Sequence, residues 1–303
     1  MSKIHWLALS MIQGIGGTTA RKLVERFGTV DSVFEVDEAN LLAVPRVTPD
    51  IARQIRNTSL ENVEAELASL DDEGITVVTL DDDDYPELLR AASDAPVVLF
   101  LCGQLRSADT RAVAVVGTRE PSERGRQAAE ELASELASRK WTIVSGLALG
   151  IDTAAHRGAL AAKGGRTLAV LGSGLRVIHP RENVSLAEAI ASRGALMSEL
   201  HPATPPRGPQ LMARDRIISG LSRAVIVVEA GEKSGSLDTA SKARKQGRTV
   251  FAVPGSPGAD QLIASGASRI EIERVKWDAL IGQLEGLSLS VVASDAPQQA
   301  KLW

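Results

Sequence analysis

The chain has little cysteine, no long hydrophobic run and no excess of positive charge. Its one cysteine, Cys102, excludes a disulfide framework and a cysteine-based zinc site, and we expect it to be a buried apolar thiol. No apolar run is long enough to span a bilayer and the N-terminus lacks a signal-peptide pattern, so we expect a cytoplasmic protein with no membrane association. With 34 basic and 38 acidic residues, the net charge of −4 does not favour nonspecific coating of DNA. Any nucleic-acid contact must therefore come from a local basic patch.

Two well-known nucleotide-binding motifs are also missing. No glycine spacing matches the dinucleotide fingerprint G-x-G-x-x-G with its later acidic residue. No G-x-x-x-x-G-K followed by Ser or Thr occurs, which argues against ATP hydrolysis by a P-loop. Four adjacent carboxylates, Asp81 to Asp84, cannot all face one metal ion, and they predict a solvated turn. We therefore expect no cofactor and no metal site.

Residues 1–70 predict a domain of short helices. The Gly14–Gly17 turn separates two segments with apolar residues at helical spacing, and Thr18 or Thr19 can cap the second helix. A helix–Gly-x-Gly–helix unit is typical of helix-hairpin-helix modules, whose backbone amides hold DNA phosphates without reading sequence. A second, weaker copy follows in residues 42–48. A module that only packs against the rest of the protein explains the pattern equally well.

The middle of the chain alternates between apolar strands and helices. Strands are predicted at residues 97–102, 112–116, 142–144, 167–171, 196–198, 224–228 and 249–253. Continuous apolar strands separated by helices, such as 124–139 and 186–193, indicate an α/β protein with a parallel sheet covered on both faces. We expect this α/β domain to span residues 71–285 and a C-terminal tail to follow at 286–303.

The most informative segment is residues 145–156, Ser-Gly-Leu-Ala-Leu-Gly-Ile-Asp-Thr-Ala-Ala-His. A β-branched run ends at a glycine-bearing turn, and a helix begins near Gly150 with Asp152 in its first turn. The place where a strand feeds a helix amino end is where α/β proteins hold phosphate. Four more units of this type occur, so several such turns converge at one sheet edge. They predict a site for a nucleotide or a nucleic acid.

The expected ligand-binding residues are glycines, hydroxyl residues and arginines in these turns. Glycine lets the backbone approach a ligand, hydroxyl groups donate hydrogen bonds, and guanidinium groups match phosphate. A solvated helix face with local salt bridges remains an alternative for one of the three arginines that follow residue 205. The DNA- or phosphate-binding candidates are Gly117, Thr118, Arg119, Ser145, Gly146, Gly172, Ser173, Gly174, Arg207, Arg214, Arg216, Ser234, Gly235 and Ser236.

Six motifs occur in a fixed order over roughly the middle two-thirds of the chain. They are V-V-G-T-R at 115–119, the segment 145–156, L-G-S-G at 171–174, R-I-I-S-G-L-S at 216–222, S-G-S-L at 234–237 and V-P-G-S at 253–256. Together they resemble the DprA/Smf DNA-processing family. The resemblance implies an extended Rossmann-like fold after a small helix-hairpin-helix or SAM-like domain, binding of single-stranded DNA, and loading of a RecA-type recombinase. It also implies that Arg119 and the 172–174 turn contact DNA phosphates.

The chain departs from the family pattern at four positions. Asp215 and Asp260 stand where the family has Asn, Asp238 stands at an apolar or amide position, and Leu149 stands at an often basic one. Carboxylates near a phosphate pocket weaken anion binding. We expect the two arginines that flank Asp215 to lower its pKa.

These carboxylates support a second candidate function. Phosphoribohydrolases of the wider superfamily resemble this chain in a glycine-rich turn followed by an acidic residue at a helix start. In an N-glycosidic hydrolase, one carboxylate stabilises an oxocarbenium-like centre or orients water and another protonates the leaving group. Helix capping or drift in a surface site is the alternative for Asp238 and Asp260. The catalytic candidates are Asp215, Asp238, Glu199 and Glu229.

Two functions therefore remain, and the sequence leaves open whether the protein is an enzyme. The favoured one is a DprA-like DNA-binding protein that acts on single-stranded or foreign DNA in processing and recombination. The alternative is a DNA glycosylase or nucleotide hydrolase, with a flipped base in the pocket, in repair or defence. The expected partners are DNA, a RecA-type recombinase and a second copy of the chain in a homodimer.

Overall fold

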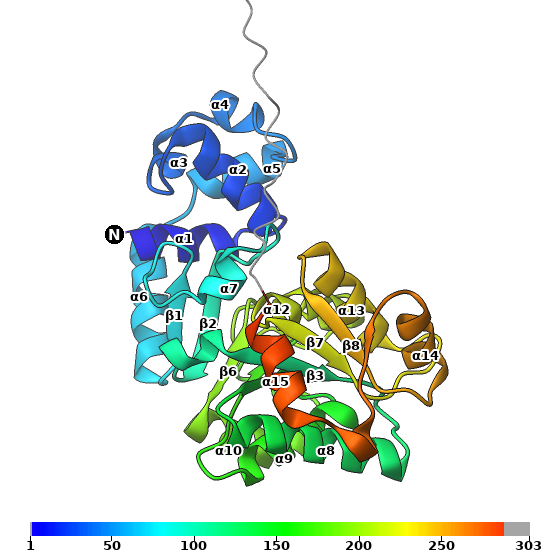
Figure 1. Ribbon diagram of the computed structural model, residues 1–303. Coiled ribbons are helices and arrows are strands. Elements are labelled where there is room, and N and C mark those ends of the chain that lie inside the picture. Colours follow the sequence, from blue (N-terminus) through cyan, green and yellow to red (C-terminus); the bar gives the residue numbers. More distant parts are fainter. Residues whose placement is uncertain (1, 288–303) are drawn as a thin grey trace, which may run out of the picture.

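A nine-stranded sheet runs through the computed structural model, which describes residues 2–287. The strands are β1 (Thr76–Thr79), β2 (Val98–Gly103), β3 (Ala112–Val116), β4 (Thr142–Ser145), β5 (Arg166–Val170), β6 (Ala195–Ser198), β7 (Ala224–Val227), β8 (Thr249–Ala252) and β9 (Ser268–Arg269). They lie in the order β1-β2-β6-β5-β4-β3-β7-β8-β9 (Figure 1). The seven strands from β6 to β9 in this order pair in parallel, and β2 pairs antiparallel with both β6 and β1.

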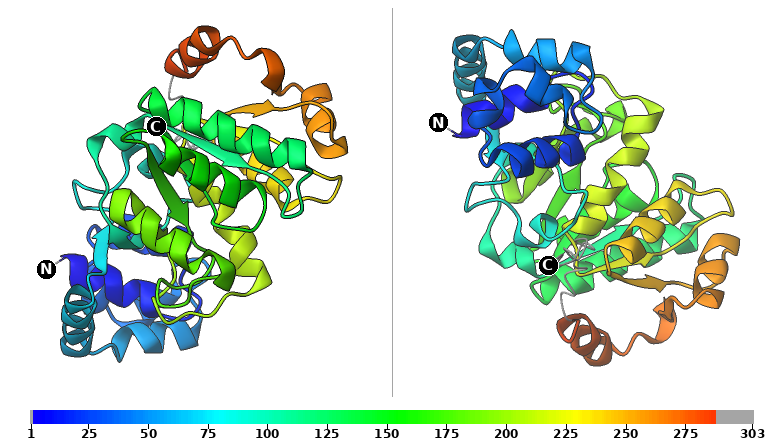
Figure 2. Two further views of the ribbon diagram at one scale, coloured as in Figure 1. Left: turned by 90° about the horizontal axis from the view of Figure 1, so that it is seen from below. Right: turned by 90° about the horizontal axis from the view of Figure 1, so that it is seen from above.

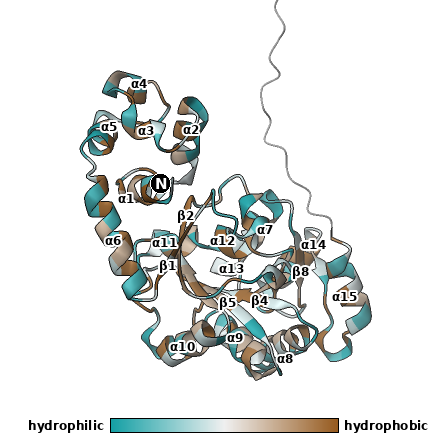
Figure 3. Ribbon diagram, turned by 90° about the vertical axis from the view of Figure 1, so that its left-hand side faces the viewer, coloured by the Kyte–Doolittle hydropathy of each residue, from teal (hydrophilic) through white to brown (hydrophobic). Residues whose placement is uncertain are grey.

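Helices cover both faces of this sheet. One face carries α8 (Glu123–Ser138), α9 (Ile151–Ala161), α10 (Val184–Arg193) and α15 (Trp277–Glu285). The other face carries α7 (Glu87–Arg90), α12 (Asp215–Gly220), α13 (Gly235–Lys245) and α14 (Pro257–Ala264), and α11 (Gly208–Ala213) comes just before α12. Figure 3 shows hydrophobic strands enclosed by helices with hydrophilic outer faces. The prediction of an α/β protein covered on both faces is confirmed.

The side chains of β3 show why this arrangement forms. Val113 and Val115 pack among the residues of α8 and α9, whereas Ala114 and Val116 pack against the helices on the opposite face. Every residue of β3 is buried, because successive side chains of a strand point to opposite faces and both faces are covered. The predicted strand at residues 112–116 matches β3 at both ends.

The N-terminal helices lie beyond the β1–β2 edge of the sheet, on the opposite side of the molecule from α15 (Figure 2). They are α1 (Ser2–Met11), α2 (Gly17–Phe27), α3 (Ser32–Glu35), α4 (Glu38–Leu42), α5 (Pro49–Arg56) and α6 (Leu60–Asp72). Trp6 is buried and its Nε1 donates a hydrogen bond to Asp81 at 2.6 Å. Val77 and Phe100 of the sheet edge belong to the same apolar cluster as these helices. The N-terminal helices therefore share a core with the sheet edge.

Several local predictions about the N-terminal half are corrected. Gly16 precedes α2 and no side chain caps that helix, so Thr18 and Thr19 do not have the capping role expected of them. A β-carbon at Gly17 would lie 2.7 Å from the carbonyl oxygen of Ala95, which shows that this hairpin approaches the α/β part closely. Cys102 is half-buried rather than buried.

Three further predictions concern turns and boundaries. The aspartate run at 81–84 lies in a turn, as predicted, and Asp82 pairs there with Lys3 at 3.1 Å. Helix α6 continues through residue 70, where we placed the domain boundary. Most of the predicted tail, residues 288–303, lies outside the described residues.

The strand order creates a switch point at β3. The chain runs from β3 outward through β4, β5 and β6, and then returns to place β7 on the other side of β3. The connections that follow β3 and β4 therefore run to one side of β3, whereas the connection that follows β7 runs to the other side. In open α/β sheets, the crevice outside the carboxyl ends of the strands at such a point is where ligands bind. Within residues 2–287, no helix is long and apolar enough to cross a membrane.

Candidate nucleic-acid interface

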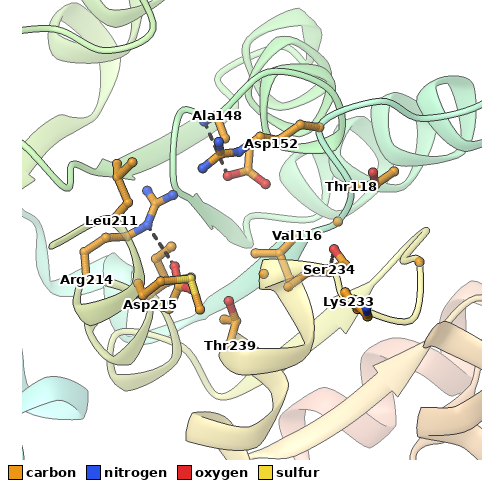
Figure 4. Close-up of a pocket in the computed structure, with 17 residues that line it drawn as sticks. Val116, Thr118, Ala148, Asp152, Leu211, Arg214, Asp215, Lys233, Ser234 and Thr239 are labelled. Carbon is orange, nitrogen blue, oxygen red and sulfur yellow. Dashed lines mark hydrogen bonds and ion pairs between the residues drawn. The ribbon is translucent and has the colours of Figure 1, made fainter. Parts of the chain in front are cut away.

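A cavity of about 490 Å³ opens at this switch point (Figure 4). Its lining residues come from the end of β3, the start of α9, helices α11 and α12, and the loop that leads into α13. They are Val116, Gly117, Thr118, Arg119, Ala148, Asp152, Leu211, Met212, Arg214, Asp215, Ile218, Gly231, Lys233, Ser234, Gly235, Ser236 and Thr239. The volume lies within the range of about 300–1,000 Å³ that is typical of small-ligand pockets.

The rim of the cavity carries positive charge and hydrogen-bond donors. Arg119 follows β3 and Lys233 precedes α13, and neither side chain has an ion pair or hydrogen bond with another residue of the described range 2–287. Gly235 and Ser236 form the first turn of α13, where backbone amides lack acceptors within the helix. This combination of free cations and helix-start amides suits an anion.

Glycine at position 117 lets the first turn pass close to its neighbour. A β-carbon there would lie 2.7 Å from the carbonyl oxygen of Glu229, next to the point where the amide of Thr118 donates to that same oxygen at 2.7 Å. Gly150, at the start of α9, has φ +81°, a conformation that favours glycine. These two glycines therefore serve close backbone packing and a backbone conformation that favours glycine.

Arg214 forms the floor of the cavity. Its side chain is 7% exposed, and its guanidinium donates to the carbonyl oxygens of Gly146 and Val170 and to the carboxylate of Asp215. The Nε–Oδ1 distance to Asp215 is 2.8 Å. Gly146 must be glycine because a β-carbon would collide with this guanidinium. Arg214 is thus fixed by buried acceptors and is not free to extend toward a phosphate.

The expected lowering of the Asp215 pKa is wrong. Burial raises the pKa of Asp215 to about 6, against the opposing charges of Arg214 and Lys242. Of the two neighbouring arginines in sequence, only Arg214 pairs with Asp215, because Arg216 points away to Glu199. Desolvation of the carboxylate outweighs the attraction of a single guanidinium here.

Asp152 is the second buried carboxylate of the cavity. It lies in the first turn of α9 and accepts hydrogen bonds from the amides of Gly146 at 3.1 Å and Ala148 at 3.4 Å. Burial raises the pKa of Asp152 despite these amides and the nearby charge of Arg214. Its role in the structure is to tie the 146–148 turn to the helix that follows.

The other catalytic candidates do not meet Asp215 in the cavity. Glu199 pairs with Arg216 through two contacts of 2.6 and 2.5 Å, outside the cavity. Asp238 pairs with Lys242 one turn further along α13 at 2.5 Å. Glu229 accepts hydrogen bonds from the amide and hydroxyl of Ser122 and lines a separate hollow of about 160 Å³. The four carboxylates are therefore dispersed over four places, each with its own partner.

The remaining predicted phosphate ligands divide into two groups. Gly117, Thr118, Arg119, Arg214, Ser234, Gly235 and Ser236 line the cavity together. Ser145, Gly146, Gly172, Ser173, Gly174, Arg207 and Arg216 do not.

The residues of the second group have structural roles or lie apart. The hydroxyl of Ser145 is buried and donates to Val115 at 2.7 Å, and that of Ser173 donates to Val177 at 2.7 Å. The turn at 172–174 was expected from the family resemblance to contact phosphate. In the structure its Gly172 lies outside the cavity lining and packs against Leu211 of α11.

Sequence reasoning missed Lys233, Thr239 and the apolar wall as parts of the site. Lys233 directly precedes the S-G-S-L motif, so its position beside an expected phosphate turn was a usable signal. The wall formed by Leu211, Met212 and Ile218 had no such signal, because apolar helix residues usually face a core. In the part of the chain that the structure describes, no group of three or more His, Cys, Asp or Glu residues could hold a metal ion.

The fold is that of a Rossmann-like protein with a cavity at the switch point of its sheet. The family described as DNA recombination-mediator protein A matches residues 76–279, and a SAM-like helix-hairpin-helix tandem matches residues 7–58. The chain belongs to the DNA recombination-mediator protein A family, which confirms the resemblance to DprA/Smf proteins.

Individual relatives agree with this assignment. The chain is 44% identical to the DNA processing protein DprA of Bacillus subtilis over 211 residues, which cover 67% of this chain and 71% of that protein. It is 37% identical to protein Smf of Escherichia coli over 269 residues, which cover 86% of this chain and 71% of that protein.

Solved structures confirm the fold. The X-ray structure of DprA from Streptococcus pneumoniae matches with a TM-score of 0.79 at 34% identity, covering 93% of this chain and 98% of that one. DprA from Helicobacter pylori, whose structure describes its binding of single-stranded DNA, matches with a TM-score of 0.62 at 31% identity, covering 70% and 98%. These relatives favour the DNA-processing function over a glycosylase.

Proposed function

We propose that this protein binds single-stranded DNA in the cavity at the carboxyl edge of its sheet and acts in DNA processing and recombination. The observation that carries the proposal is the pair of cations, Arg119 and Lys233, that flank the cavity mouth without partners in the described part of the chain. Its relative from Helicobacter pylori binds single-stranded DNA, which supports the same ligand class here.

The geometry suggests how a strand would lie. Phosphates contact Arg119 and Lys233 at the rim, where charge-assisted hydrogen bonds form without desolvating a buried group. The amides of Gly235 and Ser236 add donors for a phosphate oxygen at the start of α13. Because these contacts address the backbone of the strand, affinity depends strongly on salt.

The N-terminal helices contribute a second contact in this proposal. The helical module, which the end of α6 extends to residue 72, precedes the α/β domain, and its hairpins add affinity for phosphates without sequence preference. The alternative is a purely structural module, which the shared core with the sheet edge also suits. Because the two parts share a core, substitution of an exposed cation such as Arg46, rather than removal of the helices, separates the two roles through affinity measured on several unrelated sequences.

The dispersal of the carboxylates argues for binding rather than hydrolysis. N-glycosidic hydrolysis by two carboxylates requires them on either side of one bond. Of the four predicted catalytic carboxylates only Asp215 lines the cavity, where it pairs with Arg214. The other carboxylate of the cavity, Asp152, is held by the amides of Gly146 and Ala148. We expect no free base and no abasic site after incubation of the protein with plain or modified DNA.

The proposal includes protein partners. A RecA-type recombinase is the expected recipient of the bound strand, and a homodimer is the expected assembly, both on the family resemblance. We expect the protein to act in the cytoplasm, where such a strand and recombinase meet. Light scattering on the purified protein measures the assembly, and a pull-down with purified recombinase measures the partnership.

Removal of Arg119 tests the DNA site. Arg119→Ala should weaken binding of a mixed-sequence single strand by about 10- to 100-fold, the equivalent of about 1.5–3 kcal/mol for a charge-assisted contact. It should also lower the slope of log affinity against log salt by about one. Fluorescence anisotropy with a labelled oligonucleotide measures both quantities.

Lys163→Ala is the matched control. Lys163 is exposed in the loop between α9 and β5, at the amino edge of the sheet, and its loss removes the same unit charge. It should leave the affinity nearly unchanged. Equal effects of the two substitutions would show that net charge, rather than this cavity, binds the DNA.

A further inference from the structure

Chemically distinct parts of the cavity face different parts of a nucleotide. The rim is cationic, through Arg119 and Lys233, whereas the wall is apolar, through residues that include Val116, Met212 and Ile218. The floor holds the ion pair of Asp215 with the fixed guanidinium of Arg214 (Figure 4). A phosphate fits the cationic rim, while the flat face of a base suits the apolar wall.

One carboxylate oxygen of Asp215 accepts no hydrogen bond from another residue of the described range. Its Oδ1 accepts the hydrogen bond from Arg214 Nε, whereas no residue within the described range donates to Oδ2. Asp215 is only 6% exposed, and what exposure it has is to the cavity that it lines. This oxygen is open to the cavity, so a ligand N–H that reached it would form a charge-assisted hydrogen bond.

The bases differ in the donor that they can supply. Adenine, cytosine and guanine each carry an exocyclic amino group, and a carboxylate is a recognised acceptor for the N4 amino group of cytosine. Thymine offers only its N3–H, which lies between two carbonyl oxygens that an ionised carboxylate repels, so it is the poorest donor of the four. The floor therefore distinguishes amino-bearing bases from thymine.

We propose that Asp215 gives the DNA site a base preference, by accepting a hydrogen bond from the amino group of an adenine, cytosine or guanine inserted against the apolar wall. This inference rests on the proposed binding of single-stranded DNA and names the part of the strand that enters the cavity. Asp215 acts here as a specificity-determining residue, and no bond of the DNA is broken.

The charged groups around Asp215 set the pH range of this preference. Arg214 and Lys242 favour the ionised carboxylate, Asp152 of α9 opposes it, and burial opposes it most, so the pKa of Asp215 is about 6. Arg119 and Lys233 line the rim of the same cavity. At pH 8 the ionised group is only an acceptor, whereas at pH 5 the protonated group also donates and can bond to a thymine carbonyl. The preference should therefore weaken as the pH falls through 6.

A matched pair of oligonucleotides tests the preference. One is an oligothymidine about 12 nucleotides long, and the other has 5-methylcytosine at every second position. The two bases share shape and methyl group and differ at the 4-amino and 4-oxo groups and at N3, so stacking on the apolar wall stays nearly constant. By anisotropy at pH 8, we expect the wild-type protein to bind the 5-methylcytosine strand about tenfold more tightly.

Two variants and a pH change complete the test. Asp215→Asn offers both a donor and an acceptor and should reduce the ratio of affinities to about one, whereas Asp260→Asn, at an exposed position of α14 outside the cavity, should keep it. If Asp215→Asn fails to fold, the wild-type ratio at pH 5 against pH 8 gives the same information. Equal affinities of the wild type for the two strands at pH 8 overturn the base preference and leave DNA binding intact. Failure to bind either strand overturns the proposed function as well.

Discussion

Replacement of Asp215 by Asn should stabilise the protein at alkaline pH. Burial raises the pKa of Asp215 from its ordinary 3.8 to about 6 in the folded state. At about 1.36 kcal/mol for each pH unit, ionisation of this carboxyl costs the folded state about 3 kcal/mol relative to the unfolded chain. Asn has nearly the same shape, keeps an acceptor for Arg214 and does not ionise.

The sign of the pH dependence follows from the direction of the pKa change. Between pH 3.8 and about 6 the folded state binds more protons at Asp215 than the unfolded chain does. The contribution of this group to stability is therefore present at low pH and is lost as the pH rises through about 6. The free energy of unfolding of Asp215→Asn should exceed that of the wild type by about 2 kcal/mol more at pH 8 than at pH 4.5.

Urea denaturation of both proteins at the two pH values measures this difference. Other titrating groups contribute equally to both proteins and cancel when the two are subtracted. Asp260→Asn, which alters an exposed carboxylate outside the cavity, serves as the control. If Asp215→Asn were less stable than the wild type at pH 8 and equal to it at pH 4.5, the attraction of Arg214 would dominate over burial. The reasoning about this pocket floor would then be refuted.

Two further predictions concern other parts of the fold. Gly158→Ala should destabilise the protein by about 1–3 kcal/mol, because a β-carbon there would collide with the backbone carbonyl of Glu130 in α8. Gly282→Ala, in α15 where a β-carbon meets no other atom, should stabilise the protein by about 0.5–1 kcal/mol. If chemical denaturation showed that both substitutions stabilise the protein, or that both destabilise it, this reasoning would be contradicted. Burial lowers the pKa of His156 to about 3, so the wild type should lose about 2 kcal/mol between pH 7 and pH 5 as the unfolded chain takes up protons. His156→Asn should remove that loss relative to the wild type, and an unchanged slope would show that the ring is not held neutral.

The sequence was sufficient to predict the layers of the fold but not the order of its strands. A run such as 112–116, apolar at every position, can only be buried on both faces, and that property is local. The position of β3 between β4 and β7 depends on contacts far apart in the chain. The switch point, and with it the location of the cavity, therefore became visible only in three dimensions.

The site residues show the same limit on a smaller scale. Glycine is required at 117, beside the cavity, and at 174, because in both places another backbone segment lies too close for a β-carbon. The sequence shows that glycine is present, but it does not show whether the close neighbour is a backbone carbonyl or a bound phosphate. For Asp215, adjacency to two arginines suggested ion pairing, but one guanidinium faces the opposite way and burial dominates.

The central claim is that single-stranded DNA enters the cavity between the end of β3 and the start of α13. Photocrosslinking of an oligonucleotide that carries 5-iodocytosine, followed by mass spectrometry of the linked peptides, tests it most directly. We predict crosslinks in residues 116–119, 211–212 and 231–236, which line the cavity mouth and wall. Crosslinks confined to the N-terminal helices, or to the amino edge of the sheet around Lys163, would contradict the claim.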